Sequence, residues 1–485
     1  MLSHLRNYAS AGVVTGIVGL ISFPILTRSL TVAEYGIVGL ITSTLTLFVA
    51  IGKFGLQHAV IRFYSQVRFG NIGYSMGQLN STVSVVFFVF ASMTTLLWLV
   101  TGILILPNFM QYEQLPSLFK LAAAIVFIRL SGSAALNFLR AQQHSGDVAL
   151  SQSLARCLNL FLVLLLFFYS ELSPTSVISC LLIAEIFSVG YAFYCYSPSF
   201  QFRAKDVSSS LAKTLFIYGL PLMILESLEL VLRLSDRYMI ESMIGASALG
   251  QYSASYNLTT YIDIVILYAM VQTLKPAYLH MWEEDGKEVT QAFLSKFFRI
   301  YLITFIPFIT IFALTAPHLL RFLAGDKYAP GTVIIPYLSL SYLMMGAMHI
   351  LTAGIYIFKD TKVLVIWSSI ATVTNLLLNL FFIPIYGIVG ASAVTVISFG
   401  IFTAGVSKSA FRNVDFPIDL RTPGLMALFS LTLFFVLDPV EFGPEVVSFL
   451  VKGAIGVVVL VTAVLILEPE VKTYTKERFA KVVRG

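Results

Sequence analysis

Long apolar runs alternate with short polar segments along the chain. Each run has about twenty residues, the length that an α-helix needs to cross the hydrocarbon core of a bilayer. A transmembrane β-barrel would instead show segments of about ten residues in which apolar and polar positions alternate. The pattern therefore predicts transmembrane helices. We place fourteen spans, at residues 8–30, 36–56, 80–105, 117–138, 151–170, 175–196, 214–234, 248–274, 297–317, 333–355, 363–384, 388–407, 424–437 and 447–467.

The composition indicates the same class of protein. The 485-residue chain is 58% hydrophobic and 12% charged, and its mean hydropathy is +0.87. Soluble domains usually carry about 25% charged residues, so a soluble fold could not hide this much apolar surface. We predict an all-α integral membrane protein. The largest inner loops, predicted at 57–79, 197–213 and 275–296, are too short to form a separate soluble domain.

Basic residues are distributed unevenly over the predicted loops. With the N-terminus in the cytoplasm, the outer loops contain Arg237, Arg321 and Lys327, and the other loop Lys and Arg residues fall on the inner side. Because Lys and Arg collect in cytoplasmic loops, we expect both termini in the cytoplasm, with a basic tail over 472–484. These inner loops account for the net charge of +6, so nucleic acid is not an expected partner. The predicted location is the cytoplasmic membrane.

A short phrase recurs along the chain. FPILTRSLTVAEYGIVGL at 23–40 and MIGASALGQYSASYNL at 243–258 each end one apolar run and open the next with a Gly and a Tyr. IPIYGIVGASAVTVIS at 383–398 is a third, fainter occurrence. Aligned on Gly36 and Gly250, the phrases predict two parallel repeats, which in transporters flank a substrate path. In the first phrase we expect Ala33–Gly36 to form a tight outer turn.

The repeat and the number of runs divide the chain into three parts. We predict a six-helix lobe at 1–210, a second six-helix lobe at 211–410, and a helix pair with the basic tail at 411–485.

Several ionisable residues fall inside the predicted spans, where they are costly and usually functional. In the first lobe they are Arg28, Lys53, Lys120, Arg129, Arg156 and Glu185; in the second they are Glu226, Glu229, Arg233, Asp263 and Arg299. Long basic side chains near span ends can also reach the membrane surface, and this alternative stays open for each of them except Arg129. Arg129 lies near the centre of its span, which makes it the strongest cavity candidate.

The acidic residues in the spans have two interpretations each. Glu226, Glu229 and Arg233 share one helix face at 3–4 spacing, so they pair locally or face the interior. Asp263 and Glu185 are either neutral protonated acids or ion sites. The cations suit an anionic substrate, and phosphate above all, because the planar arginine fork donates two hydrogen bonds at once. We expect Arg28, Lys53 and Arg129, each replaced by alanine, to lose transport while folding is retained.

The sequence contains no Walker, GxSxG or HExxH motif, so we predict no catalytic residues and no metal site. Cys157, Cys180 and Cys195 fall inside apolar runs and show no disulfide or metal-ligand spacing.

Four segments resemble the Wzx-type polysaccharide flippases. They are PILTRSLTVAEYGIVGL near the start, FLRAQQHSGDVAL after the fourth run, YGLPLMI followed by LSDRYMIESMIGASALGQYSASYNL, and NLLLNLFFIPIYGIVGASAVTVIS. This resemblance implies membership of the multidrug/oligosaccharidyl-lipid/polysaccharide exporter superfamily, with two six-helix bundles of the MATE and MurJ type and alternating access. It implies a polyprenyl-diphosphate-linked oligosaccharide as substrate, made for surface polysaccharides such as O-antigen. The partners implied are membrane lipid, a glycan polymerase and chain-length proteins.

The resemblance also implies roles for individual residues. MurJ-type flippases hold basic residues of their first two helices in a central cavity, and Arg28 and Lys53 occupy comparable places. With the other basic residues of the spans, the expected diphosphate-binding set is Arg28, Lys53, Arg129, Arg156 and Arg233. No cofactor is expected beyond coupling to Na⁺ or H⁺, for which Glu226, Glu229 and Asp263 are the candidates.

Other functions remain open. A MATE-type multidrug exporter of the same superfamily usually moves cations, which the basic first lobe disfavours. A membrane-embedded glycan polymerase, ligase or glycosyltransferase would typically need a long outer loop or a soluble domain, and the predicted outer loops are short. A purely structural or lipid-scrambling scaffold is the fourth possibility.

Overall fold

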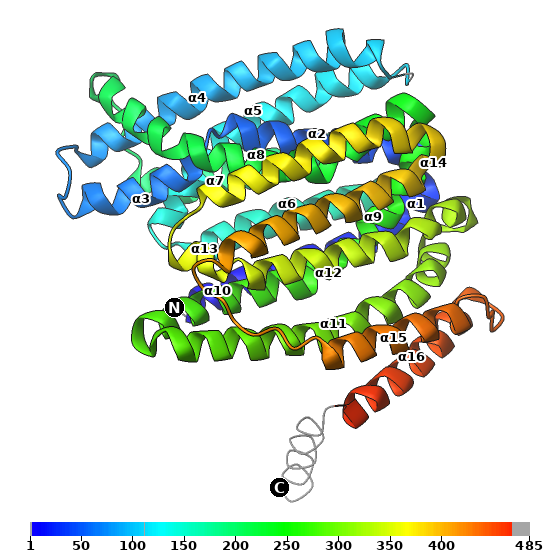
Figure 1. The fold of residues 1–485 in the computed structure, drawn as a ribbon. Coiled ribbons are helices and arrows are strands. Elements are labelled where there is room, and N and C mark those ends of the chain that lie inside the picture. Colours follow the sequence, from blue (N-terminus) through cyan, green and yellow to red (C-terminus); the bar gives the residue numbers. More distant parts are fainter. Residues whose placement is uncertain (1, 111, 468–485) are drawn as a thin grey trace, which may run out of the picture. The chain divides into compact units, whose positions relative to one another are not determined.

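The protein, described here by a computed structural model, is built from helices (Figure 1). The structure describes residues 2–110 and 112–467, with side chains from Ala11 onward, and contains no strand among them. Twelve helices of this described part are long and apolar enough to cross a membrane. A shorter apolar helix spans Arg421–Leu437, and the helix Lys362–Ala410 breaks at Gly387 (φ 60°, ψ −140°) between two predicted spans. The all-α membrane class and the count of about fourteen spans are therefore confirmed, and the arrangement in two six-helix bundles stays a prediction.

The chain forms two compact units, Met1–Ser253 and Ala254–Gly485. The helices that begin in the first unit are α1 (Leu2–Ser29), α2 (Val32–Gly52), α3 (Leu56–Arg68), α4 (Met76–Val100), α5 (Leu115–Ala141), α6 (Ser145–Tyr169), α7 (Pro174–Tyr196), α8 (Ser209–Ile244) and α9 (Ala246–Thr259). Those of the second unit are α10 (Tyr268–Glu284), α11 (Gly286–Ala324), α12 (Ile335–Leu351), α13 (Ala353–Ile357), α14 (Lys362–Ala410), α15 (Arg421–Leu437) and α16 (Glu445–Leu467). The predicted boundaries at 210 and 410 stay predictions, and the predicted basic tail at 472–484 lies outside the described residues.

Shorter helical segments connect several of these helices. The segments Thr101–Ile105 and Asp263–Leu267 are wider π-helical turns. The segments Leu106–Asn108, Ser197–Ser199, Ala204–Asp206 and Asp326–Ile334 are 3₁₀ turns.

The turn between α1 and α2 lies earlier than predicted. Thr31 caps α2: its hydroxyl accepts the Glu34 backbone N–H at 3.2 Å, and the Glu34 carboxylate accepts the Thr31 N–H at 2.8 Å. Such a capping box fixes the first residues of a helix. The prediction of a turn at Ala33–Gly36 was wrong, because these residues form the first turn of α2.

Two of the predicted inner loops are largely helical. Helix α3 occupies most of the predicted loop 57–79, and α10 and α11 meet at Asp285 within the predicted loop 275–296. Helix α3 is amphipathic, so its polar face resembled a loop in the sequence while its apolar face is buried. Its buried residues are Leu56, Gln57, Ala59, Val60, Tyr64 and Val67.

Helix α8 also runs further than its predicted span. It continues to Ile244, so Arg237, which the sequence placed in an outer loop, is only 7% exposed, and the neighbouring Asp236 is 1% exposed. The Arg237 guanidinium contacts the Ser43 hydroxyl and donates to the Gly39 carbonyl at 3.4 Å. The Tyr252 hydroxyl donates to the Asp236 carboxylate at 2.8 Å. These interactions compensate the buried charges and tie α8 to α2 and α9.

Glycines bring α2 close to α8 and α9 at two places. A Cβ atom on Gly250 of α9 would lie 1.9 Å from the Val32 carbonyl oxygen, and one on Gly36 would lie 2.6 Å from the Gly250 nitrogen. Gly36 and Gly250, which the sequence aligned as equivalent, are thus in contact. After α2, a Cβ on Gly55 (φ 70°) would lie 2.0 Å from the Gly219 carbonyl oxygen of α8. The segment from Gly36 to Gly55 therefore packs closely on α9 at its start and on α8 at its end.

In the second unit, α15 and α16 pack on α11. The Glu445 carboxylate of α16 accepts from His318 Nδ1 at 2.6 Å and from the Arg321 guanidinium at 3.2 Å, both on α11. Lys452 is 2% exposed and donates to the Asp438 carbonyl at 2.9 Å, which joins the two helices of the pair.

The contact of Gly36 with Gly250 predicts a large effect of an added methyl group. Gly250→Ala should destabilise the protein by at least about 1–3 kcal/mol, because the new atom meets backbone that cannot rotate away. The measurement is the thermal unfolding midpoint of the purified protein in detergent.

The matched control for this substitution is Gly190→Ala in α7. Nothing lies within 4 Å of a Cβ at Gly190, and replacing a helical glycine by alanine usually stabilises by about 0.5–1 kcal/mol. Equal unfolding midpoints for the two variants would contradict the described packing of α9 on α2.

Candidate functional site

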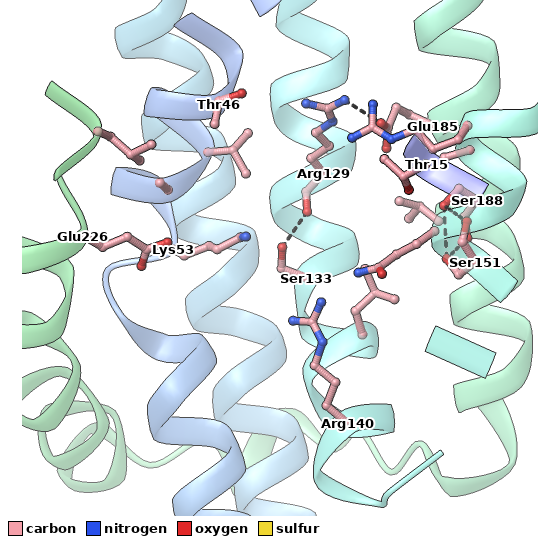
Figure 2. A pocket seen from close by; sticks show the side chains of 18 of the residues that line it. Thr15, Thr46, Lys53, Arg129, Ser133, Arg140, Ser151, Glu185, Ser188 and Glu226 are labelled. Carbon is pink, nitrogen blue, oxygen red and sulfur yellow. Dashed lines mark hydrogen bonds and ion pairs between the residues drawn. The ribbon is translucent and has the colours of Figure 1, made fainter. Parts of the chain in front are cut away.

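A cavity of about 670 Å³ lies within the first unit, lined by α1, α2, α5, α6, α7 and α8 (Figure 2). Helix α1 contributes Thr15 alone. On the other helices the lining positions recur at helical spacing, so each presents one face to the cavity. Helix α5, for example, contributes Arg129, Ser133, Leu136 and Arg140, and α8 contributes Glu226, Glu229, Leu230 and Arg233.

Charged side chains dominate this lining. The basic ones are Lys53, Arg129, Arg140, Arg156 and Arg233, and the acidic ones are Glu185, Glu226 and Glu229. The cations outnumber the carboxylates by two, so the formal charge of the lining is positive. Charges inside a membrane protein usually face a bundle interior or a watery cavity. Because the cations of this lining outnumber the carboxylates, the arrangement is typical of a site for an anion.

Lys53 stands where α2 ends and turns into α3. It is the residue after Gly52, and the turn continues through Phe54 and Gly55, which both have positive φ. A cation near the carboxyl end of a helix is favoured by the helix dipole. Lys53 lies within electrostatic range of Arg140, Glu226 and Arg129, and among the described residues it makes no ion pair or hydrogen bond through its side chain. Figure 2 shows Lys53 and Glu226 on one side of the cavity and Arg129 and Glu185 on the other.

Arg129 and Glu185 form the closest ion pair in the cavity. The guanidinium of Arg129 on α5 lies 2.6 Å from the Glu185 carboxylate on α7, and the two side chains are 23% and 13% exposed. Glu185 is thus the ion-pair partner of Arg129, a contact that neither sequence-based interpretation included. Arg156 of α6 is within electrostatic range of both partners.

The acidic residues of α8 differ in their surroundings. Glu226 accepts a hydrogen bond from Gln57 of α3 at 2.8 Å, and His58 Nε2 lies 4.0 Å away. Glu229 is more exposed than Glu226 and faces the cavity with Arg233. The shared face predicted for Glu226, Glu229 and Arg233 thus lines the cavity.

The structure brings together most of the predicted site residues, but not all. Lys53, Arg129, Arg156 and Arg233 of the predicted diphosphate set line the cavity, as do Glu226 and Glu229 of the coupling set. Arg28 has an exposed side chain at the end of α1 and is not part of the lining. Asp263 lies in a π-helical turn of the second unit, also outside the lining. The binding and coupling roles themselves stay predictions.

Arg140 is the lining cation that sequence reasoning missed. The prediction assigned it to an inner loop, whereas it is in the last turn of α5 and donates to the Asn137 side chain at 3.0 Å. Its position eleven residues after Arg129 gives three helical turns on the same face, and this spacing was the available signal.

Among the described residues, no group of three or more His, Cys, Asp or Glu side chains could hold a metal ion. The other polar side chains of the lining are the Gln152 amide and several hydroxyls. Ser151 and Ser188 bond reciprocally between α6 and α7: each hydroxyl donates to the other residue's carbonyl, at 3.0 and 2.8 Å.

The fold of this helical membrane protein resembles solved structures of other membrane proteins. "Lipid II flippase MurJ, inward closed conformation" matches with a TM-score of 0.76 and 15% identity, over 97% of this chain and 100% of that one. An inward-facing multidrug resistance MATE family transporter of the MOP superfamily matches with a TM-score of 0.72 and 12% identity, over 82% and 94%. At these identities the likeness shows the fold.

Sequence comparison gives the family. A model of the family described as "Polysaccharide biosynthesis protein" matches residues 6–282, and the chain belongs to this family. The uncharacterized membrane protein MJ1068 of Methanocaldococcus jannaschii is 27% identical over 284 residues, which are 55% of this chain. The chain spans about half the length of that relative, 54%. The two matched structures are named as a flippase and a multidrug transporter, which agrees with the prediction that the protein is not an enzyme.

The cavity predicts that Lys53 contributes to anion binding. Lys53→Gln should weaken the binding of inorganic diphosphate about tenfold, the factor that corresponds to one hydrogen bond with a charged group. Isothermal titration of the purified protein in detergent measures this change.

Lys120→Gln is the matched control, because Lys120 is an exposed lysine of α5 outside the lining. It should leave the affinity unchanged. If both variants lost affinity equally, the cavity would not be the place where the anion binds.

Proposed function

We propose that this protein is a flippase that moves a polyprenyl-diphosphate-linked oligosaccharide across the cytoplasmic membrane by alternating access, for surface polysaccharide biosynthesis. The observation that carries the proposal is the charge of the cavity in a member of the polysaccharide biosynthesis family. A diphosphate that is esterified at both ends, to lipid and to sugar, carries two negative charges. The cavity lining has five basic and three acidic side chains, an excess that such a diphosphate would neutralise.

The chemistry of the cations supports a phosphoryl ligand. Four of the five are arginines, and the planar guanidinium fork binds phosphate through two hydrogen bonds at once. In the proposal, the diphosphate contacts Lys53, Arg129, Arg140 and Arg156. Arg233 of α8 adds a further positive charge to the lining.

The size of the cavity sets what it holds at one time. Pockets for small molecules usually measure about 300–1,000 Å³, and this one measures about 670 Å³. In the described conformation it suits a diphosphate with its first sugars, while the polyprenyl chain stays among the lipids.

Transport against a gradient needs an energy source, and we propose coupling to Na⁺ or H⁺. Glu226 and Glu229 face the cavity, where a cation or proton would offset their charge as substrate leaves. Asp263 is the remaining candidate, in the second unit. In the proposal both termini lie in the cytoplasm. The proposed partners are membrane lipid and the proteins that act on the transported oligosaccharide, a glycan polymerase and chain-length proteins.

Multidrug export is the second candidate, because a MATE family transporter shares the fold. Its usual substrates are cations, which the excess of basic residues in the lining disfavours. The flippase explains both the family and the charge.

Deletion of the gene tests the proposal in cells. Surface polysaccharide should disappear while lipid-linked oligosaccharide accumulates on the cytoplasmic side of the membrane, because the units are made but not moved. Immunoblotting of the surface glycan and mass spectrometry of extracted lipid carriers measure the two quantities.

Complementation sharpens this experiment. The wild-type gene and the Lys120→Gln gene should restore the surface glycan, and a Lys53→Gln/Arg156→Gln gene should restore much less at equal membrane abundance. Glycan that reaches the surface unpolymerised in the deletion strain would indicate a polymerase instead of a flippase.

A further inference from the structure

We propose that Glu185 acts as an internal anion that holds Arg129 when the site is empty and competes with the substrate diphosphate for it, so that Glu185 promotes substrate release. The proposal rests on the proposed function and names a residue that sets the turnover of that site. Its basis is the arrangement of Arg129, Glu185 and Arg156 around one side of the cavity.

Arg129 has a strong partner within the protein itself. Its guanidinium lies 2.6 Å from the Glu185 carboxylate, and the pair connects α5 to α7 at the cavity wall (Figure 2). A charge-assisted hydrogen bond of this length is among the stronger interactions between side chains. A diphosphate that binds Arg129 must therefore displace Glu185 or share the guanidinium with it.

Two other cations of the cavity lining differ from Arg129 in their partners. Lys53 and Arg156 line the same cavity, and neither side chain makes an ion pair with a carboxylate among the described residues. They can receive a phosphoryl group without breaking an existing bond. A diphosphate thus has two kinds of partner here, cations that are available at once and one cation that must exchange its partner.

Arg156 makes the exchange feasible. It lies within electrostatic range of both Arg129 and Glu185, so a displaced Glu185 carboxylate stays close to a positive charge. Removing one partner of a buried ion pair is costly when the other charge is left uncompensated. In the proposed cycle, Arg129 is paired with Glu185 in the empty protein and with phosphate in the loaded one, and it is never left alone inside the membrane.

A purely structural ion pair makes the opposite prediction. If Arg129 and Glu185 only fasten α5 to α7, the substitution Glu185→Gln should loosen the cavity and weaken ligand binding. If Glu185 competes with the ligand, the same substitution should strengthen binding and slow release. The sign of the change in affinity therefore decides between them.

The experiment measures binding and flipping by the purified full-length protein. The ligands are N-acetylglucosaminyl-diphospho-undecaprenol, undecaprenyl phosphate and inorganic diphosphate. Glu185→Gln should bind the diphosphate lipid about tenfold more tightly, as expected if one charge-assisted hydrogen bond no longer has to be exchanged. It should flip this lipid more slowly in proteoliposomes, and its affinity for the monophosphate should change much less.

Inorganic diphosphate separates the headgroup from the whole lipid. A gain that is equal for inorganic diphosphate and for the diphosphate lipid places the competition at the phosphoryl groups, as proposed. A gain confined to the lipid would overturn the proposal, because Glu185 would then act on the sugar or the polyprenyl chain.

Two further variants isolate the contact with Arg129. Glu229→Gln removes the same charge from the same cavity without touching Arg129, so it should tighten diphosphate binding less than Glu185→Gln does. In an Arg129→Gln background, adding Glu185→Gln should give no further gain, because the cation for which Glu185 competes is absent.

Glu185→Asp covers the case in which the amide variant misfolds. Its carboxylate reaches less far toward Arg129, so it should shift the diphosphate affinity in the same direction by a smaller factor.

Weaker or unchanged diphosphate binding by folded Glu185→Gln and Glu185→Asp proteins would overturn the inference. This failure is separate from a failure of the proposed function. Tighter binding by Glu185→Gln, together with normal surface glycan in the deletion strain, would leave the competition intact and refute the flippase role. Loss of surface glycan on deletion, with unchanged affinity of the variant, would do the reverse.

Discussion

A charged side chain inside a membrane needs a counter-charge, a hydrogen-bond partner or water, and this constraint organises the first unit of the protein. Eight of its ionisable side chains line one cavity, and they lie along one face of each of several helices. Asp236 and Arg237 lie outside this lining and are buried with polar partners on neighbouring helices. Arg28 and Lys120 also lie outside it and are exposed.

Close backbone contacts make this arrangement possible. Helix α2 contacts Gly250 of α9 at one end, and the turn that follows it contacts Gly219 of α8 at the other. The residues of α2 and α8 that face the cavity, such as Lys53 and Glu226, fall between these contacts. Small residues at the contacts and long charged ones between them leave room for the cavity without loosening the packing of the unit.

The sequence predicted the class of fold well, because a run of about twenty apolar residues has one physical solution in a bilayer. It also identified most of the cavity cations, since a charge within an apolar run is conspicuous. It failed where tertiary contacts decide. Arg140 looked like a loop residue because the end of α5 is polar, and the polar face of α3 hid a helix. The pairing of Arg129 with Glu185 joins residues on separate helices, and no local pattern records which helices become neighbours. Arg28 resembled the cavity cations in sequence, but it is exposed at the end of α1 and lies outside the lining.

The last two helices show how such a protein can be extended. Lys452 closes α15 and α16 onto each other, and Glu445 fastens the pair to His318 and Arg321 of α11. A hairpin that satisfies its own buried charge and docks on one existing helix is nearly self-sufficient. Evolution can therefore gain or discard it as a module, and related chains of different length can keep the same central machinery.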